Sequence, residues 1–489
     1  MNLAIIAPEL TLFCGALLIL MLDVFLAKKV KNFFCISHLL ALIFTTISLF
    51  MVIKNFNTGE SSFSNMFEST PLTAFCKALA ITLLTVVILY SLNFVISAPK
   101  ISAEFLALLM IATTGGMVLI SATDFLVFYL GLELQALSLY LLAAINRNSP
   151  KSSEAGMKYF ILGCLASGIL LFGISMIYGF SGTTNFRTMM ELYQSTTATL
   201  PTKVSIGVLF GFILVITAMF FKISAAPFHM WSPDVYEGAP TIVTTFFATI
   251  AKLTTVAAFI HLLCSLQIKW LGIEKIFIFT AILSLAVGSF GAIFQKNFKR
   301  LLAYSSIGHI GFILLAISTL SREGMTSALL YITIYAIISL GAFGFLLLIS
   351  SANFDKESDE ENERIFAISS LAGLAKTNPT MAFALATLIF SSAGIPPLAG
   401  FFSKFYVLAS ALSHGFLISS IAAILFSVVS AFYYLRIVKI MYFDEPQKVM
   451  SLKTITNVKV MILFAAIFNL LLIFALNPLL SSIGNFLFF

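Results

Sequence analysis

Long apolar runs separated by short polar connections make up almost the whole chain. About fourteen of these runs reach roughly 20 residues, the length that an α-helix rising about 1.5 Å per residue needs to cross a bilayer. The pattern predicts an all-α polytopic membrane protein with about 14 transmembrane helices. The predicted spans cover residues 3–26, 33–53, 72–97, 104–121, 124–145, 155–179, 205–226, 240–263, 272–294, 300–320, 325–350, 379–412, 416–442 and 455–480.

Two of these spans, the seventh and the twelfth, are interrupted by prolines. The seventh reaches Pro227, and the unusually long twelfth contains Gly394 followed by Ile-Pro-Pro. Because proline removes a backbone donor and clashes with the preceding turn, both spans are predicted to be broken helices. Paired broken helices in two halves of a chain are typical of a transport site near the middle of the bilayer.

The twelfth span comes five spans after the seventh, so spans four to eight and nine to thirteen are predicted to be two copies of one unit. Because five is an odd number, the second copy must be inverted in the membrane. The register is loose, since Lys222 precedes its proline whereas Lys404 follows its own. The predicted domains are an N-terminal three-helix segment (1–97), two inverted five-helix repeats (104–263 and 272–442) and a C-terminal helix (455–489).

Lysine and arginine are concentrated in the odd-numbered connections between the spans. Since basic loops stay in the cytoplasm, both termini are predicted to lie outside. The first span has no basic segment before it and carries Glu9 near its start, so we expect a membrane helix and not a cleaved signal peptide. The acidic run from Asp355 to Glu363 is predicted to be a solvated loop.

Composition agrees with the hydropathy pattern and excludes several classes of protein. Hydrophobic residues make up 60% of the chain and charged residues 10%, with a mean hydropathy of +1.04, values that no soluble globular domain of this size shows. The net charge of +7 indicates no nucleic-acid partner, because the basic residues fall in loops. The five cysteines are far apart and lack CxxC spacing, which argues against an iron–sulfur cluster, a zinc site or a disulfide framework.

Three ionisable residues are predicted to lie too deep in the bilayer to reach water. Lys222 follows a long apolar run, Lys252 is about twelve residues into the eighth span, and Glu133 lies within the fifth. A charge at this depth costs several kcal/mol and usually indicates function. The alternatives are a lysine neutralised by burial and a salt bridge that only joins two helices.

Four further residues are weaker candidates for the same kind of site. Lys404 follows the second helix break, where water could reach its amine, and His309 shares a helical face with two serines. Lys158 is near the start of the sixth span and could instead extend to the cytoplasmic surface. His229 lies beside the first break, where an interfacial position is as reasonable as a role in proton entry.

Together these residues form a row of titratable groups across spans five to twelve. Such a row suits proton movement better than the binding of an organic substrate. A carboxylate favours the charged form of a nearby lysine, so moving or neutralising the carboxylate would release the proton of the lysine. The chain has no P-loop, no dinucleotide fingerprint and no haem or flavin motif, so a partner or an ion gradient must supply the energy.

The residues around Lys222 form a long motif from Phe221 to Pro240, in which Phe-Lys-x-Ser-x-x-Pro-Phe-His-x-Trp is followed by x-Pro-Asp-x-Tyr-x-Gly-Ala-Pro. Two further segments accompany it, 299–309 and 394–404. With the glutamate of the fifth span and the lysine of the eighth, this set resembles the signature of the antiporter-like membrane subunits of respiratory complex I, the proton-pumping NADH-quinone oxidoreductase. The resemblance covers essentially the whole chain.

The resemblance implies a role for each position. Glu133 would pair with Lys222, and Lys252 would be the central relay. Lys158 would bridge them, and Lys404 would pass the proton toward the far side or a neighbouring subunit. From their positions, we expect His309 and His229 to take part in the relay as well. It also implies a bacterial inner membrane with both termini periplasmic, and partners among the membrane-arm subunits, including antiporter-like siblings. No cofactor is expected in this chain, since FMN and the iron–sulfur clusters would lie in partner subunits.

Two other functions remain open at this point. One is the membrane subunit of a multisubunit cation/proton antiporter or of a membrane-bound hydrogenase, which would show sodium-dependent activity without NADH. The other is a structural scaffold whose buried charges only orient the helices. In a scaffold, replacing Lys252 by methionine would leave pumping intact.

Overall fold

The fold was analysed in a computed structural model, which describes residues 3–26, 33–56, 59–97, 102–196, 203–266, 272–351, 365–446 and 455–487. The solvated loop predicted at 355–363 lies outside these residues. Almost everything described is helical, as predicted, apart from one short antiparallel hairpin of β1 (Glu60–Ser62) and β2 (Phe67–Ser69). The fold is therefore an all-α membrane architecture.

Within the described residues, twelve helical segments are long and apolar enough to cross a membrane. Each coincides with a predicted span to within a few residues. Eleven are single helices: α1 (Ala7–Leu26), α2 (Phe33–Lys54), α3 (Pro71–Ser97), α4 (Ser102–Ser121), α5 (Phe125–Ala143), α6 (Pro150–Ser181), α12 (Glu274–Ile293), α13 (Phe298–Ile317), α14 (Arg322–Ser351), α19 (Leu417–Phe443) and α20 (Thr456–Phe486). The twelfth, the predicted eighth span, joins α10 (Thr241–Phe246), a π-helical turn η2 (Phe247–Ala251) and α11 (Lys252–Leu266).

The two spans predicted to be broken are each made of two helices. The seventh is α8 (Lys203–Lys222) followed by the short α9 (Trp231–Gly238), and the twelfth is α17 (Pro379–Ala393) followed by α18 (Ala399–Ser413). The sequence pattern did not predict the remaining small elements. These are α7 (Phe186–Thr196), η3 (Ile368–Leu371) and α16 (Leu374–Thr377).

The first break begins earlier than the proline that suggested it. The helix α8 ends at Lys222, where the amides of Ser224 and Ala225 bond back to the carbonyls of Phe221 and Phe220. This is a Schellman motif, with Ser224 at a φ of 59° in the position that glycine usually takes. The helix therefore ends by its own capping, before Pro227 can interrupt it.

The second break uses the same motif. The amides of Gly394 and Ile395 bond back to Ser391 and Phe390 at the end of α17, and Gly394 has a φ of 88°. Glycine suits this position because a side chain at this positive φ would be strained. Both breaks thus place helix-terminal carbonyls inside the bundle, where Phe221 and Ala393 accept bonds from the site described below.

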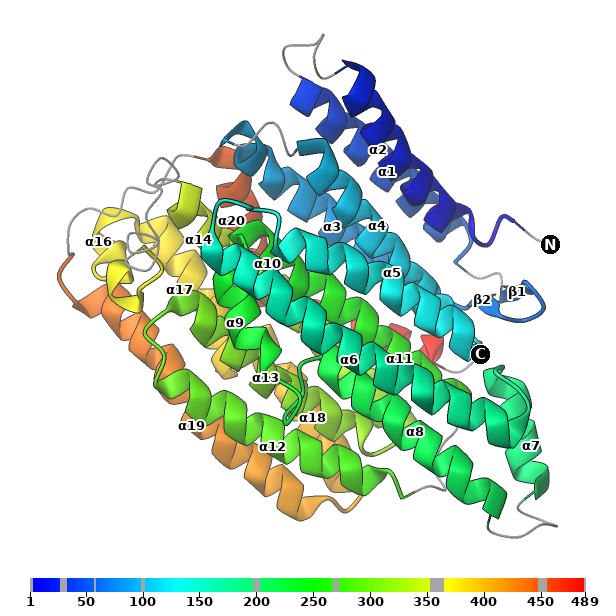
Figure 1. Cartoon of the computed structure of the whole chain (residues 1–489). Helices are drawn as coiled ribbons and strands as arrows, with labels where there is room; N and C mark the ends of the chain where they lie inside the picture. The colour runs from blue at the N-terminus through cyan, green and yellow to red at the C-terminus, as the bar shows by residue number, and fades with distance from the viewer. Residues whose placement is uncertain are drawn as a thin grey trace.

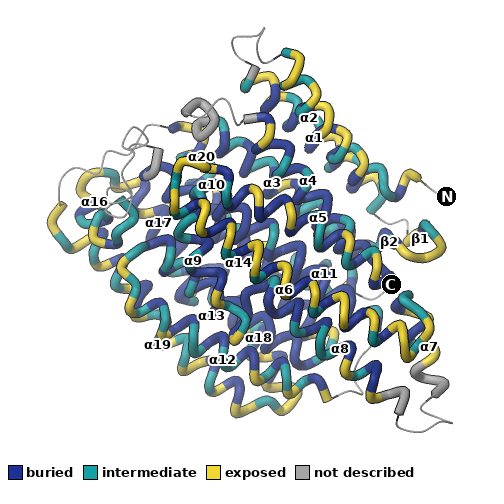
Figure 2. Tube along the Cα trace, viewed as in Figure 1, coloured by how far each residue is buried: buried dark blue, intermediate teal, exposed yellow. Residues whose placement is uncertain are grey.

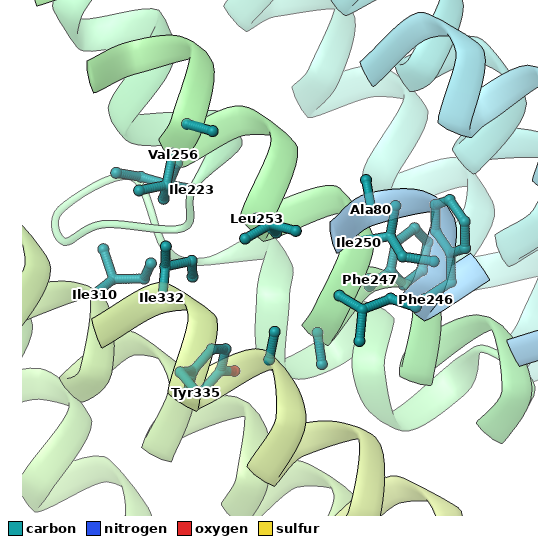
Figure 3. Packing of buried hydrophobic residues seen from close by; sticks show 14 of the residues in the cluster. Ala80, Ile223, Phe246, Phe247, Ile250, Leu253, Val256, Ile310, Ile332 and Tyr335 are labelled. Carbon is teal, nitrogen blue, oxygen red and sulfur yellow. The ribbon is translucent and has the colours of Figure 1, made fainter. Parts of the chain in front are cut away.

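The helices lie roughly parallel in a broad bundle (Figure 1). The pair α1 and α2 forms one edge, and α12 and α19 form the opposite edge (Figure 1). These outer helices carry many exposed residues (Figure 2), large hydrophobic ones among them. The centre is α11 and α14, which are buried along nearly their whole length. Figure 3 shows this core, where Leu253 and Val256 of α11 face Ile310 of α13 and Ile332 of α14.

Both ends of the described chain lie toward the same end of the bundle, near the β hairpin (Figure 1). Packing also recurs in order along the chain, since α4 packs against α5 and α11, as α12 packs against α13 and α19. This order is what a five-helix repeat requires. The inversion of the repeat, the domain boundaries and the side of the membrane on which the termini lie remain predictions.

Candidate functional site

The structure brings Glu133 of α5 and Lys222 of α8 together, as predicted. Lys222 Nζ lies 3.8 Å from Glu133 Oε1 and 3.4 Å from both Tyr140 OH and Ser167 Oγ. The Ser167 hydroxyl donates a short hydrogen bond to Glu133. The carboxylate is therefore shared between a serine and a lysine, and the ammonium group is not bound tightly to any one oxygen.

Lys222 owes its position to the end of α8. As the last residue of the helix, it places its ammonium group near the negative end of the helix dipole, which stabilises a cation. The Phe221 carbonyl, which already accepts the Ser224 amide of the capping motif, also accepts a hydrogen bond from Trp231 Nε1 at 2.9 Å. The break thus fixes both the lysine and a tryptophan beside it.

Lys252 lies at the junction between the π-helical turn and α11 and is 2% exposed. Its ammonium group donates to Ser306 Oγ of α13 at 2.7 Å and lies 5.5 Å from the centre of the Tyr236 ring. A hydroxyl and an aromatic face stabilise a cation less than a carboxylate does. Single π-helical turns are frequent at functional sites, in agreement with a special role for this residue.

One small cavity connects the two lysines. Its volume is ≈ 20 Å³, measured as space for the centre of a water-sized sphere, and about 10–15 Å³ is enough for one water molecule. Most of the wall is apolar, and its polar members are Gln135, Tyr159, Lys222, Lys252 and Thr255. The lining residues are Leu132, Gln135, Ala136, Leu139, Tyr159, Lys222, Trp231, Phe247, Ala251, Lys252 and Thr255.

Lys404 lies at the second break and is 7% exposed. Its ammonium group donates to the freed Ala393 carbonyl of α17 at 2.7 Å and to Ser427 Oγ of α19 at 3.0 Å. The Phe312 ring centre is 5.2 Å away. The second half of the chain therefore holds its lysine with a backbone carbonyl where the first half uses a glutamate.

His309 of α13 is 8% exposed, and it lies between Ser306, the partner of Lys252, and Phe312, the ring beside Lys404, along the same helix. Its two ring nitrogens lie 2.8 Å from Tyr331 OH and 3.0 Å from Tyr434 OH. Tyr434, on α19, also shares a short hydrogen bond with Ser305. Sequence reasoning did not identify these tyrosines, because tyrosines in apolar spans are usually core residues.

Lys158 has different neighbours from those that the resemblance implied. Its side chain is 42% exposed, and its ion pairs go to Glu154 at 2.7 Å and to Asp234 of α9 at 2.8 Å. These contacts match the surface position that the sequence left open. His229, between α8 and α9, is partly exposed.

A charged network missed by the sequence reasoning surrounds α9. Arg300 of α13 bonds Asp234 at 2.8 Å and Glu237 at 2.9 Å, and Asn297 donates to Glu237 at 3.2 Å. Lys299, which the sequence placed in a basic connection, is buried and donates to the carbonyl of Ala239 at 2.9 Å. The signal was present in the segment 221–240, where Asp234 and Glu237 lie three residues apart on one helical face.

A second buried ion pair also went unnoticed. Lys77 Nζ of α3 lies 2.6 Å from Glu9 Oε1 of α1, with side chains 3% and 2% exposed. The reasoning that identified Glu133 applies equally to these two positions, since both are charges inside apolar runs. Among the described residues, no cluster of histidine, cysteine, aspartate or glutamate could hold a metal ion.

The fold and its row of buried lysines define a multi-pass membrane subunit of the antiporter-like class. A family model described as NADH:quinone oxidoreductase/Mrp antiporter, TM, matches residues 122–433. The chain is 42% identical over 453 residues to NADH-quinone oxidoreductase subunit N of Paramagnetospirillum magneticum, covering 91% of this chain and 89% of the relative. It is 41% identical over 445 residues to subunit N 1 of Rhizobium meliloti, covering 90% and 88%. The chain therefore belongs to the NADH-quinone oxidoreductase subunit N family.

A solved structure supports the same assignment. A chain of respiratory complex I from Thermus thermophilus with bound aureothin matches with a TM-score of 0.79 and 25% identity, over 97% of this chain and 99% of that one. The protein is thus a multi-pass inner-membrane subunit of complex I, with other membrane-arm subunits, antiporter-like ones included, as its partners. The family resemblance predicted from the sequence is confirmed.

Proposed function

We propose that this chain moves protons across the membrane along a relay from Glu133 through Lys222 and Lys252 to Lys404. The observation that carries the proposal is the cavity that Lys222 and Lys252 share. Two lysines that line one water-sized space can exchange a proton through a single water molecule. His309, with its two tyrosine partners, would extend the path toward Lys404.

The pair of Glu133 and Lys222 would be the switch. While the carboxylate is charged and close, it favours the protonated lysine. When Glu133 is neutralised or moves further from Lys222, that attraction weakens and the lysine gives its proton to the cavity water. At 3.8 Å the attraction is already weaker than in a direct contact. A shift of a few pK units, about 1.4 kcal/mol each, would therefore reverse the preference.

The energy would come from electron transfer in partner subunits. NADH oxidation and quinone reduction would occur elsewhere in the complex, with FMN and iron–sulfur clusters there and no redox cofactor in this chain. A conformational change at the subunit boundary would reach Glu133, whose side chain is 17% exposed. With basic connections in the cytoplasm, both termini would lie on the periplasmic side.

The direct test is Lys252→Met in the assembled complex. We expect normal assembly, together with a loss of proton pumping and a parallel loss of NADH-quinone turnover, because the two are tightly coupled. Lys376→Met, at an exposed position away from the lysine row, is the matched control and should leave both unchanged. Normal turnover with normal proton stoichiometry in the Lys252→Met complex would contradict the relay and favour the scaffold.

A second experiment separates the branches of the family. The native protein should co-purify with an NADH dehydrogenase that contains FMN and iron–sulfur clusters. Sodium-dependent ion exchange without NADH, in a complex that lacks these groups, would instead assign the chain to a cation/proton antiporter.

A further inference from the structure

The short helix α9 is held by charged groups from both halves of the chain. Asp234 Oδ2 lies 2.8 Å from Lys158 of α6, and Asp234 Oδ1 lies 2.8 Å from Arg300 of α13. Glu237 binds Arg300 at 2.9 Å, and the end of the helix is bound by Lys299 through the Ala239 carbonyl. Four contacts therefore fix a helix of eight residues.

The same helix supplies a wall of the cavity between the two relay lysines. Trp231, its first residue, is 3% exposed and lines that cavity. Its ring stacks on Tyr159 with centroids 4.5 Å apart and an interplanar angle of 19°. Because Trp231 also bonds the Phe221 carbonyl beside Lys222, its position affects both the cavity and the lysine.

The ion pair and the ring stack join the same two helices, α6 and α9. On α6, Lys158 and Tyr159 are consecutive residues. On α9, Trp231 and Asp234 are three residues apart and therefore share one face. The contact between Lys158 and Asp234 therefore holds α9 against α6 next to the stack of Trp231 on Tyr159. Moving the carboxylate away from α6 would move the tryptophan with it.

We propose that Asp234 is a positioning residue, which keeps Trp231 in the cavity wall and so limits proton passage between Lys222 and Lys252. The inference rests on the proposed relay. We call the ion pairs of Asp234 and Glu237 with Lys158 and Arg300 the clamp. The side chains of the clamp are 25% to 42% exposed, so each ion pair is weak and can open without unfolding the core. The stacked rings, in contrast, are buried. The clamp can therefore open and close during turnover.

The clamp also connects α9, which lies beside Lys222, to α13, which lies beside Lys252. Arg300 and Asn297 stand at the start of α13, the helix that carries Ser306, the hydrogen-bond partner of Lys252. A shift of α9 would act on α13 through Asp234 and Arg300. The lysine at the helix break and the partner of the central lysine are therefore coupled through one aspartate.

The test compares Asp234→Asn with Glu154→Gln in the assembled complex reconstituted into proteoliposomes. Both changes remove a carboxylate bound to Lys158, but only Asp234 is on α9. For Asp234→Asn we expect NADH-quinone turnover to persist while protons moved per NADH fall, because an unfixed tryptophan lets protons slip back. Hydrogen exchange of the amides of residues 223–238 should rise roughly two- to fivefold, as the loss of an exposed ion pair predicts. Asp234→Glu should restore the proton ratio, and Glu154→Gln should match the unmodified complex.

An unchanged proton ratio and unchanged exchange in Asp234→Asn would overturn the proposal, as would the same defect in Glu154→Gln. If Asp234→Asn does not assemble, Trp231→Phe replaces it. That variant keeps an aromatic ring but loses the bond to the Phe221 carbonyl, and a normal proton ratio there would also overturn the proposal. Failure of the relay looks different, since Lys252→Met would then turn over and pump normally.

Discussion

Two buried ion pairs in this protein have the same chemistry and opposite geometry. Glu9 and Lys77, in the N-terminal helices, are 2.6 Å apart and almost fully buried, and Lys77 lies 4.7 Å from the ring centre of Phe67. Glu133 and Lys222 are 3.8 Å apart, with the carboxylate 17% exposed. We call the first pair closed, because its two groups are in direct contact and buried. We call the second pair open, because its groups are further apart, Glu133 also binds Ser167, and Lys222 lines the cavity.

The difference shows how one pair can be static and another can switch. Electrostatic attraction grows as distance and local dielectric constant fall, so separating the closed pair would cost much more than separating the open one. Both members of the open pair also have other hydrogen-bond partners, Ser167 for Glu133 and Tyr140 for Lys222, which lowers the cost of separating them. We infer that Glu9 and Lys77 join α1 to α3, while Glu133 and Lys222 change charge during turnover.

The largest effect is expected for Lys77→Met. This change leaves the Glu9 carboxylate buried without its cation, which typically costs about 3–5 kcal/mol. We expect a lower yield of assembled complex and a lower thermal midpoint, measured by native electrophoresis and scanning calorimetry. The double variant with Glu9→Gln should recover most of the loss, since no charge is then left unpaired. A double variant as unstable as the single one would contradict a closed ion pair.

The corresponding change in the open pair, Lys222→Met, should affect activity more than stability. Glu133 keeps Ser167 as a partner and can take up a proton, so the complex should assemble. We expect NADH-quinone turnover to fall at least about tenfold, equivalent to ~1.4 kcal/mol of barrier. The yield of assembled complex and its turnover, measured on the same preparation, check this. A low yield of complex whose assembled fraction keeps normal specific activity would contradict the comparison.

A smaller effect is expected when Ser167→Ala makes the open pair resemble the closed one. Removing the hydroxyl leaves Lys222 as the main partner of Glu133, and a hydrogen bond to a charged group is worth about 1.5–3 kcal/mol. The ion pair should shorten and release its proton less readily. We expect turnover to fall severalfold with unchanged assembly, and faster pumping would show that the serine restrains the switch.

The smallest effect concerns the closed pair. Phe67→Leu removes the aromatic face beside Lys77, a contact worth roughly 0.5–2 kcal/mol. The thermal midpoint should fall slightly, and NADH-quinone turnover should not change. A loss of turnover in this variant would place the N-terminal pair in the proton path and remove the distinction between the two pairs.

Much of the fold could be predicted because membrane spans follow from continuous apolar runs. The spans and both broken helices were predicted in this way. The end of α8 was misplaced, because Ser224 adopts a conformation that usually belongs to glycine and ends the helix before Pro227. The short α7 and α9 contain too many polar residues for hydropathy to reveal them.

The site was predicted where a charge stands alone in an apolar run, as for Glu133, Lys222 and Lys252. Site residues were missed where their role depends on contacts between helices that are distant in the sequence. Asp234 and Arg300 are polar residues in polar segments, and only the tertiary contact of α9 with α13 gives them a role. The positions of the two tyrosines beside His309 likewise depend on α14 and α19 and not on local sequence.

The most direct test of the account is infrared difference spectroscopy of the complex during reduction by NADH, in the region where protonated carboxyl groups absorb. If Glu133 changes its protonation state, the unmodified complex should show a carboxyl band that Glu133→Gln abolishes and Glu9→Gln leaves intact. A band that survives Glu133→Gln, or one that disappears with Glu9→Gln, would contradict the claim that the open pair is the switch.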